Sequence, residues 1–148
     1  MAAVALYGAA VVAAGLASTP QQLKAGEFKC FDDWCAGMLS VRPEDQAGRL
    51  VVAVRLENRA RGRAMRSNLA RAYVELPGGG QIRPDDARSL QTFIEAQGQA
   101  DIALAFTLPK ATRPARFVVT EGIDGLGPGT FIVGDEASPF HARAGWPL

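Results

Sequence analysis

A strict alternation of apolar and polar residues restricts this chain to a protein built mainly of β-strands. In the segment 50–57 every second residue, from Leu50 to Leu56, is a large aliphatic one, and the other residues of the segment include Arg55 and Glu57. A two-residue period places alternate side chains on opposite faces of a strand, so this strand is expected to be half buried. The same alternation returns in the segment 102–108. We therefore predict two amphipathic antiparallel strands.

Shorter segments of strand-like composition lie between glycine, proline and aspartate residues, which favour turns. We predict further strands at 27–31, 36–42, 70–76, 80–83, 116–120 and 130–134. Only 87–96 has features of a helix, and its centre, Gln91-Thr92-Phe93-Ile94, favours a strand or a turn comparably. Many short strands with regularly spaced turns are typical of a β-sandwich or barrel. The alternation of strands and helices required by nucleotide-binding α/β folds is missing from the pattern.

The charge balance excludes several function classes. The chain has 148 residues, with 16 basic and 15 acidic side chains. That length can bury one self-sufficient core, and the near-zero net charge provides no global field for nucleic acid. Because His141 is the only histidine, multi-histidine metal sites are excluded. No cofactor is predicted.

The N-terminal segment differs from the rest of the chain. Residues 1–23 contain no Asp, Glu, Lys, Arg or His, and residues 2–17 are all hydrophobic or glycine. As a helix these sixteen residues would span about 24 Å, less than the roughly 30 Å hydrocarbon core of a bilayer. We predict a signal peptide or membrane anchor at 1–20, a linker at 21–26 and a domain at 27–148, with a buried helix of a cytosolic protein as the alternative. Membrane association is expected through residues 2–17.

Two cysteines, Cys30 and Cys35, are separated by four residues. A turn at the two aspartates between them would bring the Cα atoms to about 5.5 Å, as a disulfide requires. Behind an export signal a disulfide is the expected fate of such a pair. The alternatives are free structural thiols and a soft-metal site completed by Met38 or His141.

The segment 58–71 is rich in arginine and lies between two predicted strands. We expect an exposed loop whose guanidinium groups can bind phosphate, carboxylate or an anionic headgroup. The run contains no aromatic residue, which disfavours nucleic acid. The alternative is a solvated loop without a ligand. The candidate binding residues are Arg59, Arg61, Arg63, Arg66 and Arg71.

A third candidate site lies near the C-terminus, where Asp135, Glu136, Ser138 and His141 fall close together. A hydroxyl, an imidazole and a carboxylate could act as nucleophile, base and orienting group, and Asp135, Glu136 and His141 could hold a metal. However, Pro139 follows the serine and removes the backbone N–H that an oxyanion hole uses at that position. The alternative is that these groups satisfy backbone donors where the last strand ends.

The order of these features resembles uncharacterised immunoglobulin-like extracytoplasmic domains of bacterial envelope proteins that follow a single N-terminal hydrophobic segment. The resemblance covers about residues 26–148. It rests on the Cys30-Phe31-Asp32-Asp33-Trp34-Cys35 motif, the strand 50–58 with its arginine-rich continuation, the strand and turn 73–80, the strand ending at 106–109, and the segment 132–141. Members of this group usually have a histidine near the second cysteine, which Trp34-Cys35-Ala36 lacks. The resemblance implies an immunoglobulin-like fold and an envelope location, without a known activity.

Together these features predict an all-β, immunoglobulin-like antiparallel β-sandwich preceded by an N-terminal hydrophobic helix. We expect an extracytoplasmic binding or assembly module without catalytic activity, whose partner is another envelope protein or a membrane complex. One alternative is an envelope enzyme or metal-handling protein that uses the C-terminal candidate residues. Another is a lipid- or polysaccharide-binding module with Trp34, Trp146 and the arginines as contacts. The sequence does not indicate an oligomeric state.

Overall fold

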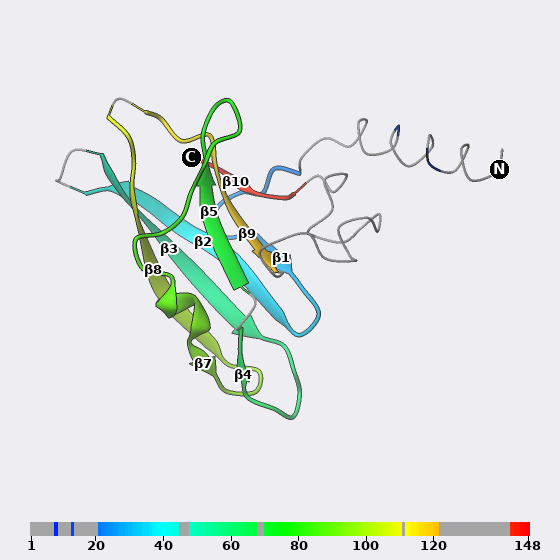
Figure 1. Cartoon of the computed structure of the whole chain (residues 1–148). Helices are drawn as coiled ribbons and strands as arrows, with labels where there is room; N and C mark the ends of the chain where they lie inside the picture. Colours follow the sequence, from blue (N-terminus) through cyan, green and yellow to red (C-terminus); the bar gives the residue numbers. More distant parts are fainter. Residues whose placement is uncertain are drawn as a thin grey trace.

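Two four-stranded antiparallel sheets form the centre of the computed structural model (Figure 1). The structure describes residues 8, 13, 21–44, 48–67, 70–110, 112–121 and 143–148. The first sheet has the order β1 (Phe28–Cys30), β2 (Trp34–Pro43), β3 (Arg49–Asn58), β8 (Gln99–Thr107). The second has the order β10 (Trp146–Pro147), β9 (Arg116–Glu121), β5 (Ala70–Glu75), β6 (Gln81–Ile82). A two-stranded ribbon pairs β4 (Met65–Arg66) with β7 (Phe93–Ile94), and a 3₁₀ turn, η1, spans Arg88–Gln91.

The alternating segments form the centre of the first sheet. Strand β3 pairs with both β2 and β8, and Val52 lies directly opposite Leu104 in the register. Both side chains are fully buried, as is Val54 two residues further along β3. The two-residue period predicted this face correctly because the other sheet covers one side of these strands. The prediction of an all-β protein with antiparallel sheets is confirmed.

Aromatic rings join the two layers. Phe106 on β8 meets Phe117 on β9 edge to face, with ring centroids 6.0 Å apart. Phe117 in turn contacts the ring of Trp146 on β10, at 5.7 Å between centroids. All three side chains are fully buried. Truncation of any one of them should therefore be among the most destabilising changes in the protein.

Both sides of the sandwich are closed by contacts between the sheets. On one side Lys29 Nζ of β1 donates to the Val119 carbonyl of β9 at 3.2 Å, and Trp146 Nε1 donates to the Glu27 carbonyl at 3.1 Å. On the other side η1 contacts both β8 and β5 and buries Leu90. Backbone groups at these edges are therefore partly satisfied by side chains.

The segment 21–26, predicted as a linker, lies against the sandwich. Leu23 belongs to the buried core, and its N–H donates to the Gly145 carbonyl at 2.9 Å. Gln22 and Gly145 form a parallel bridge. A side chain at Gly145 would come within 2.8 Å of the Phe117 carbonyl, so the close approach requires glycine there.

Several predictions are confirmed only in part or concern residues that the structure does not describe. The segment 87–96 forms η1 and then β7, so the strand-or-turn alternative is correct and the helix is wrong. The strand predicted at 130–134 lies outside the described residues, as does the N-terminal segment except for residues 8 and 13. Among the described residues, no helix has the length and apolar character needed to span a bilayer.

Candidate functional site

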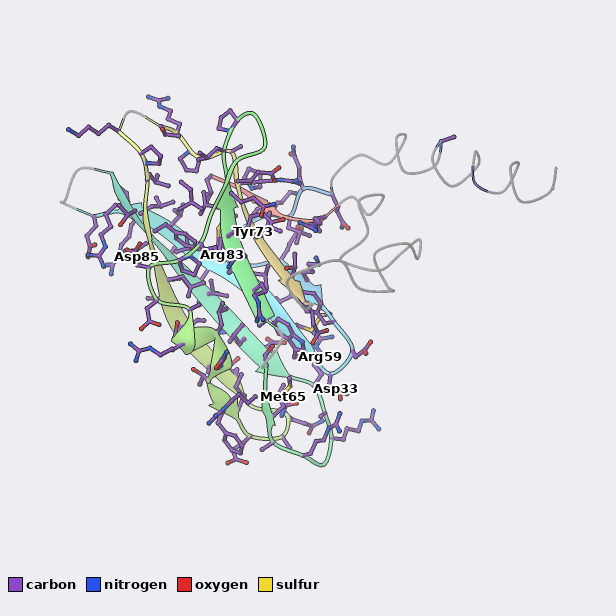
Figure 2. All side chains as sticks on the ribbon, viewed as in Figure 1. Asp33, Arg59, Met65, Tyr73, Arg83 and Asp85 are labelled. Atoms are coloured by element: carbon purple, nitrogen blue, oxygen red, sulfur yellow. A yellow bond between two sulfur atoms is a disulfide. The ribbon has the colours of Figure 1, made fainter. Side chains whose placement is uncertain are left out.

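Most of the arginine-rich segment lies at one end of the sandwich, which we call the arginine end. It comprises the β1–β2 turn, residues 59–64 after β3, the β4–β7 ribbon and the β7–β8 turn at 95–98. Figure 2 shows Asp33, Arg59 and Met65 together at this end, while Asp85 lies toward the other. Segments that are distant in the sequence therefore form one surface.

A disulfide closes the β1–β2 hairpin at this surface. Cys30 and Cys35 are bonded and lie directly opposite one another in the register. Their Cα atoms are 4.0 Å apart, closer than expected, because the hydrogen bond from Phe31 N to Trp34 O leaves the cysteines in the closely spaced type of antiparallel pair. The predicted disulfide is confirmed. The alternatives of free thiols and of a metal site formed by both thiolates are wrong.

Trp34 fixes the hairpin turn from inside. Its ring stacks on Phe31 with centroids 4.3 Å apart, and its indole Nε1 donates to Glu121 Oε1 at 3.0 Å. Trp34 is only 3% exposed, and Trp146 is fully buried. The alternative in which these two tryptophans contact a lipid or polysaccharide is therefore wrong, because both complete the core.

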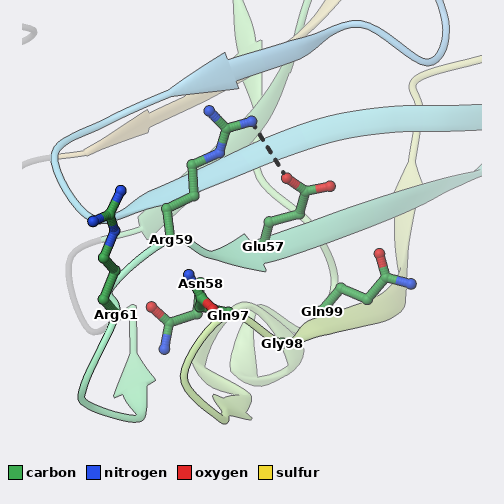
Figure 3. Close-up of a pocket in the computed structure, with 7 residues that line it drawn as sticks. All are labelled: Glu57, Asn58, Arg59, Arg61, Gln97, Gly98 and Gln99. Atoms are coloured by element: carbon green, nitrogen blue, oxygen red, sulfur yellow. Dashed lines mark ion pairs between the residues drawn. The ribbon is translucent and has the colours of Figure 1, made fainter.

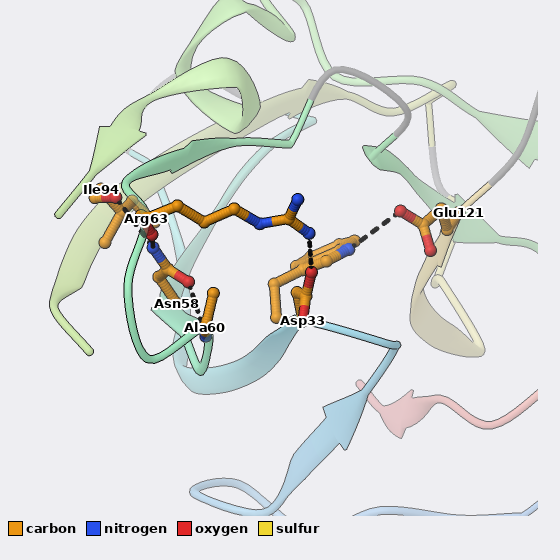
Figure 4. Close-up of polar contacts among 7 residues, drawn as sticks. Asp33, Asn58, Ala60, Arg63, Ile94 and Glu121 are labelled. Atoms are coloured by element: carbon orange, nitrogen blue, oxygen red, sulfur yellow. Dashed lines mark hydrogen bonds and ion pairs between the residues drawn. The ribbon is translucent and has the colours of Figure 1, made fainter. Parts of the chain in front are cut away.

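Asn58, at the end of β3, is the polar centre of the arginine end (Figure 4). Its Nδ2 donates to the carbonyls of Arg63, Ile94 and Glu95 at 2.9, 3.1 and 3.1 Å. Its Oδ1 accepts the Ala60 N–H at 2.9 Å. Since the side chain is 2% exposed, these bonds replace water and tie β3, the approach to β4 and the β7–β8 turn together. In the sequence this residue resembles an ordinary turn asparagine, so pattern reasoning missed it.

Two of the candidate arginines lie in ion pairs at this end. Arg63 pairs with Asp33, and Arg59 lies 3.6 Å from Glu57. The backbone N–H of Arg59 also donates to the Asp33 carbonyl at 2.7 Å. Asp33 therefore connects the disulfide hairpin to the arginine segment.

The expectation that all five arginines lie in one loop is wrong. Arg66 belongs to β4, and Arg71 belongs to β5, where its guanidinium donates to the Ala70 carbonyl at 3.0 Å. The segment is long enough to fold back after Asn58 and form a strand that pairs with β7. The pairing of β4 and β5 with their neighbouring strands, and not the conformation of a loop, therefore sets the positions of Arg66 and Arg71.

Arg61 and Arg66 are exposed and have no ion-pair partner within the described part of the chain. Arg66 lies opposite Phe93 in the β4–β7 ribbon. The Phe93 side chain is 57% exposed, which is unusual for a large apolar residue in this protein. Two cations and an aromatic ring therefore share this surface, a combination enriched in protein contacts.

The sandwich is similar to solved structures of two bacterial proteins. It matches MPT63, a secreted protein of Mycobacterium tuberculosis, with a TM-score of 0.58 and 8% identity over 89% of this chain and 100% of that one. It also matches an uncharacterised β-sandwich protein of Clostridium difficile, with a TM-score of 0.50 and 8% identity over 88% of this chain and 97% of that one. No protein-family model and no curated protein matches the sequence. At this identity the likeness shows the fold, a β-sandwich, and confirms that prediction.

An open polar pocket of about 630 Å³ lies at the arginine end, between the end of β3 and the β7–β8 turn (Figure 3). It is lined by Glu57, Asn58, Arg59, Arg61, Gln97, Gly98 and Gln99. Figure 3 shows Arg59 and Glu57 pointing toward one another, with Arg61 outside this ion pair. Gln97 has a positive φ of 57°, a conformation that costs energy for a residue with a side chain. Sequence analysis identified the arginines but missed the glutamines, because only the folded turn brings them to the same place.

The C-terminal candidates Asp135, Glu136, Ser138 and His141 lie outside the described residues. In the described ranges, no group of three or more histidine, cysteine, aspartate or glutamate side chains is arranged to hold a metal ion.

The clear pKa shifts belong to two ion pairs that do not line the pocket. On the first sheet, two hydrogen bonds of 2.7 Å from Arg55 lower the pKa of the Asp101 carboxyl. Near η1, the side chain and backbone N–H of Arg88 lower the pKa of Asp86 to about 2.

Proposed function

We propose that this protein is an immunoglobulin-like, extracytoplasmic module of the bacterial cell envelope that binds another protein and catalyses no reaction. The arginine end is its contact surface, and the partner presents acidic side chains. The main observation in favour of this proposal is that Arg61, Arg66 and Phe93 are exposed together on a surface whose backbone is held by buried side chains.

The rigidity of this surface supports a binding role. The disulfide hairpin, the Arg63–Asp33 pair and the Asn58 bonds hold the segments that present the free arginines. A preorganised surface loses little conformational entropy on binding, so more of the contact energy remains as affinity. An aromatic ring flanked by arginines can supply a buried anchor together with charge-assisted hydrogen bonds.

The disulfide also supports the location. Disulfides persist in oxidising compartments and are rare in a reducing cytosol. The uncharged segment 1–20 acts as a signal peptide or a membrane anchor, so the module is either released or tethered outside the cytoplasmic membrane.

Charge reversal tests the proposed contact surface. The full chain and an Arg61→Glu/Arg66→Glu variant are each used to capture proteins from a bacterial envelope extract at low and at high salt, with identification by mass spectrometry. The wild type should retain partners with acidic surfaces at low salt and lose them at high salt, because screening weakens exposed charge contacts. The double variant should not retain them at either salt concentration.

Arg113→Glu/Arg42→Glu is a matched control. Both arginines are exposed, have no ion-pair partner within the described ranges and lie toward the other end of the strands. The control changes the net charge equally and should keep the captured proteins. Equal capture by all three proteins would show that the arginine end is not the contact surface.

A further inference from the structure

Three side chains that line the pocket at the arginine end have hydrogen-bond donors available to a ligand. Arg61 and the amides of Gln97 and Gln99 form no ion pair or side-chain hydrogen bond with any described residue. Asn58 also lines the pocket, but both polar atoms of its side chain are already bonded to backbone groups. Ligand contacts must therefore come from the arginines and glutamines around it.

The charge of the lining favours a ligand with one negative charge. Arg59 and Arg61 contribute two positive charges, and Glu57 contributes one negative charge. Glu57 lies 3.6 Å from Arg59, so it largely offsets that cation and would repel a dianion such as phosphate. Arg61 is left as the uncompensated cation, and a planar guanidinium matches the two oxygens of a carboxylate.

The walls of the pocket are held in place before any ligand binds. The Arg59 N–H donates to the Asp33 carbonyl at 2.7 Å, and the Asn58 N–H donates to the Gly98 carbonyl at 2.9 Å. Gly98 N donates to the Glu95 carbonyl at 2.9 Å, which closes the turn that carries Gln97. The left-handed conformation of Gln97 at this turn is maintained although it is strained, as is common at ligand sites.

We propose that this pocket binds a carboxylate of an acidic peptide segment, with Arg61 as the pairing cation and Gln97 and Gln99 as additional donors. The inference rests on the proposed function, because it assigns the partner's carboxylate to one place on the arginine end. The carboxylate can come from a glutamate or aspartate side chain or from a peptide C-terminus.

The test is a titration of the isotope-labelled full chain followed by NMR. Three probes are used separately: an acetylated, amidated triglutamate, an acetylated triglycine with a free C-terminus, and inorganic phosphate. Binding in the pocket should shift the Gly98 amide and the side-chain amides of Gln97 and Gln99. A response to triglutamate alone identifies side-chain carboxylates, and a response to triglycine alone identifies a C-terminal carboxylate.

Variants connect the shifts to the named groups. Arg61→Gln should weaken binding of the responding peptide about tenfold, as expected for the loss of one charge-assisted contact. Gln97→Leu should weaken it about threefold. Arg113→Gln is the matched control, since it removes an exposed arginine toward the other end of the strands that does not line the pocket. It should leave the peptide affinity unchanged.

Four outcomes would overturn the inference. They are that no peptide shifts these signals, that phosphate shifts them at equal concentration, that Arg61→Gln binds like the wild type, or that Arg113→Gln weakens binding as much as Arg61→Gln does. These failures are distinguishable from failure of the proposed function. If partner capture still depends on the Arg61/Arg66 pair while the peptides do not bind, only the pocket assignment is wrong. If peptides bind the pocket but charge reversal leaves capture unchanged, the contact surface for the partner is wrong.

Discussion

The two ends of the sandwich are stabilised in different ways. At the arginine end, a disulfide, the buried Asn58 and the stacked Trp34 fix the chain with side chains that are largely removed from water. At the other end, the β5–β6 connection is a glycine turn closed by Leu76 N and the Gly80 carbonyl at 2.7 Å. The nearby charges include an exposed pair, Arg49 with Glu44 at 2.9 Å, and a half-buried pair, Arg116 with Glu75. Fully buried polar bonds such as those of Asn58 define one geometry, whereas exposed pairs contribute little, so the arginine end is better suited to hold a binding surface.

Among changes that distinguish the two ends, Asn58→Ala should have the largest effect. The substitution removes the side-chain partner of the Ala60 N–H and of the Arg63 and Ile94 carbonyls, while the Glu95 carbonyl keeps its bond from the Gly98 N–H. We expect the free energy of unfolding to fall by about 3 kcal/mol, measured by urea denaturation. The comparison at the other end is Asp85→Ala, which removes two exposed bonds to Thr107 and should cost about 1 kcal/mol or less. Equal losses would contradict the difference between the ends.

Removal of the disulfide should have the next largest effect. The bond closes a short loop, so the chain-entropy model gives about 2 kcal/mol of stabilisation. Cys30→Ala/Cys35→Ala should lower the unfolding free energy by that amount in denaturant titrations. It should also loosen Asp33, which the hairpin presents to Arg59 and Arg63. Faster amide exchange of Arg59, with Leu76 unchanged, would show that the effect is local to the arginine end, and equal change at both would contradict it.

Glycine substitutions should show smaller and opposite effects at the two ends. Gln97→Gly relieves a positive φ of 57° and should stabilise the protein by at most about 1 kcal/mol, after the added flexibility of the unfolded chain is subtracted. Gly78→Ala, at a φ of 99° in the other turn, should destabilise it by about 1 kcal/mol, although the space around Gly78 is open. Thermal unfolding of both variants measures the signs. Stabilisation by Gly78→Ala would contradict the conformational explanation.

The smallest effect concerns the exposed Asp86–Arg88 pair near η1. Arg88 lowers the pKa of Asp86 to about 2 from its usual 3.8. A lowered pKa means that the contribution of the pair to stability is complete above pH 4 and is lost as the pH falls through 2. An NMR titration of the Asp86 carboxyl measures this value directly, and Arg88→Gln should raise it toward 3.8. An unchanged pKa in the variant would show that Arg88 is not the cause.

The sequence predicted the long strands of the first sheet and the disulfide correctly. For Val52 and Leu104 the alternation reports directly which side faces the core, because side-chain direction in a strand is fixed by the backbone. The Cys30–Cys35 pair was predictable because its spacing fits a hairpin. For β7 the pattern was ambiguous, since a two-residue strand is too short to show a period.

The candidate site was predicted only in part. An arginine-rich stretch indicates that cations are present, but spacing cannot show which of them find a carboxylate. Asp33 comes from the β1–β2 hairpin and pairs with Arg63. Arg71 belongs to strand β5 and therefore does not lie with the exposed arginines of this end. Trp34 and Trp146 looked available as contacts, and only packing between the sheets shows that they are buried.

The sequence by itself determined that this chain forms antiparallel strands, which face of β3 and β8 is buried, and that its cysteines can bond. These properties follow from local periodicity and short spacing, which act along the chain. Only the tertiary structure decided which arginines remain free and that Gln97 and Gln99 join Arg61 around a pocket supported by Asn58. These residues are far apart in sequence, and the contacts that select them form only when β3, the ribbon and the β7–β8 turn pack together.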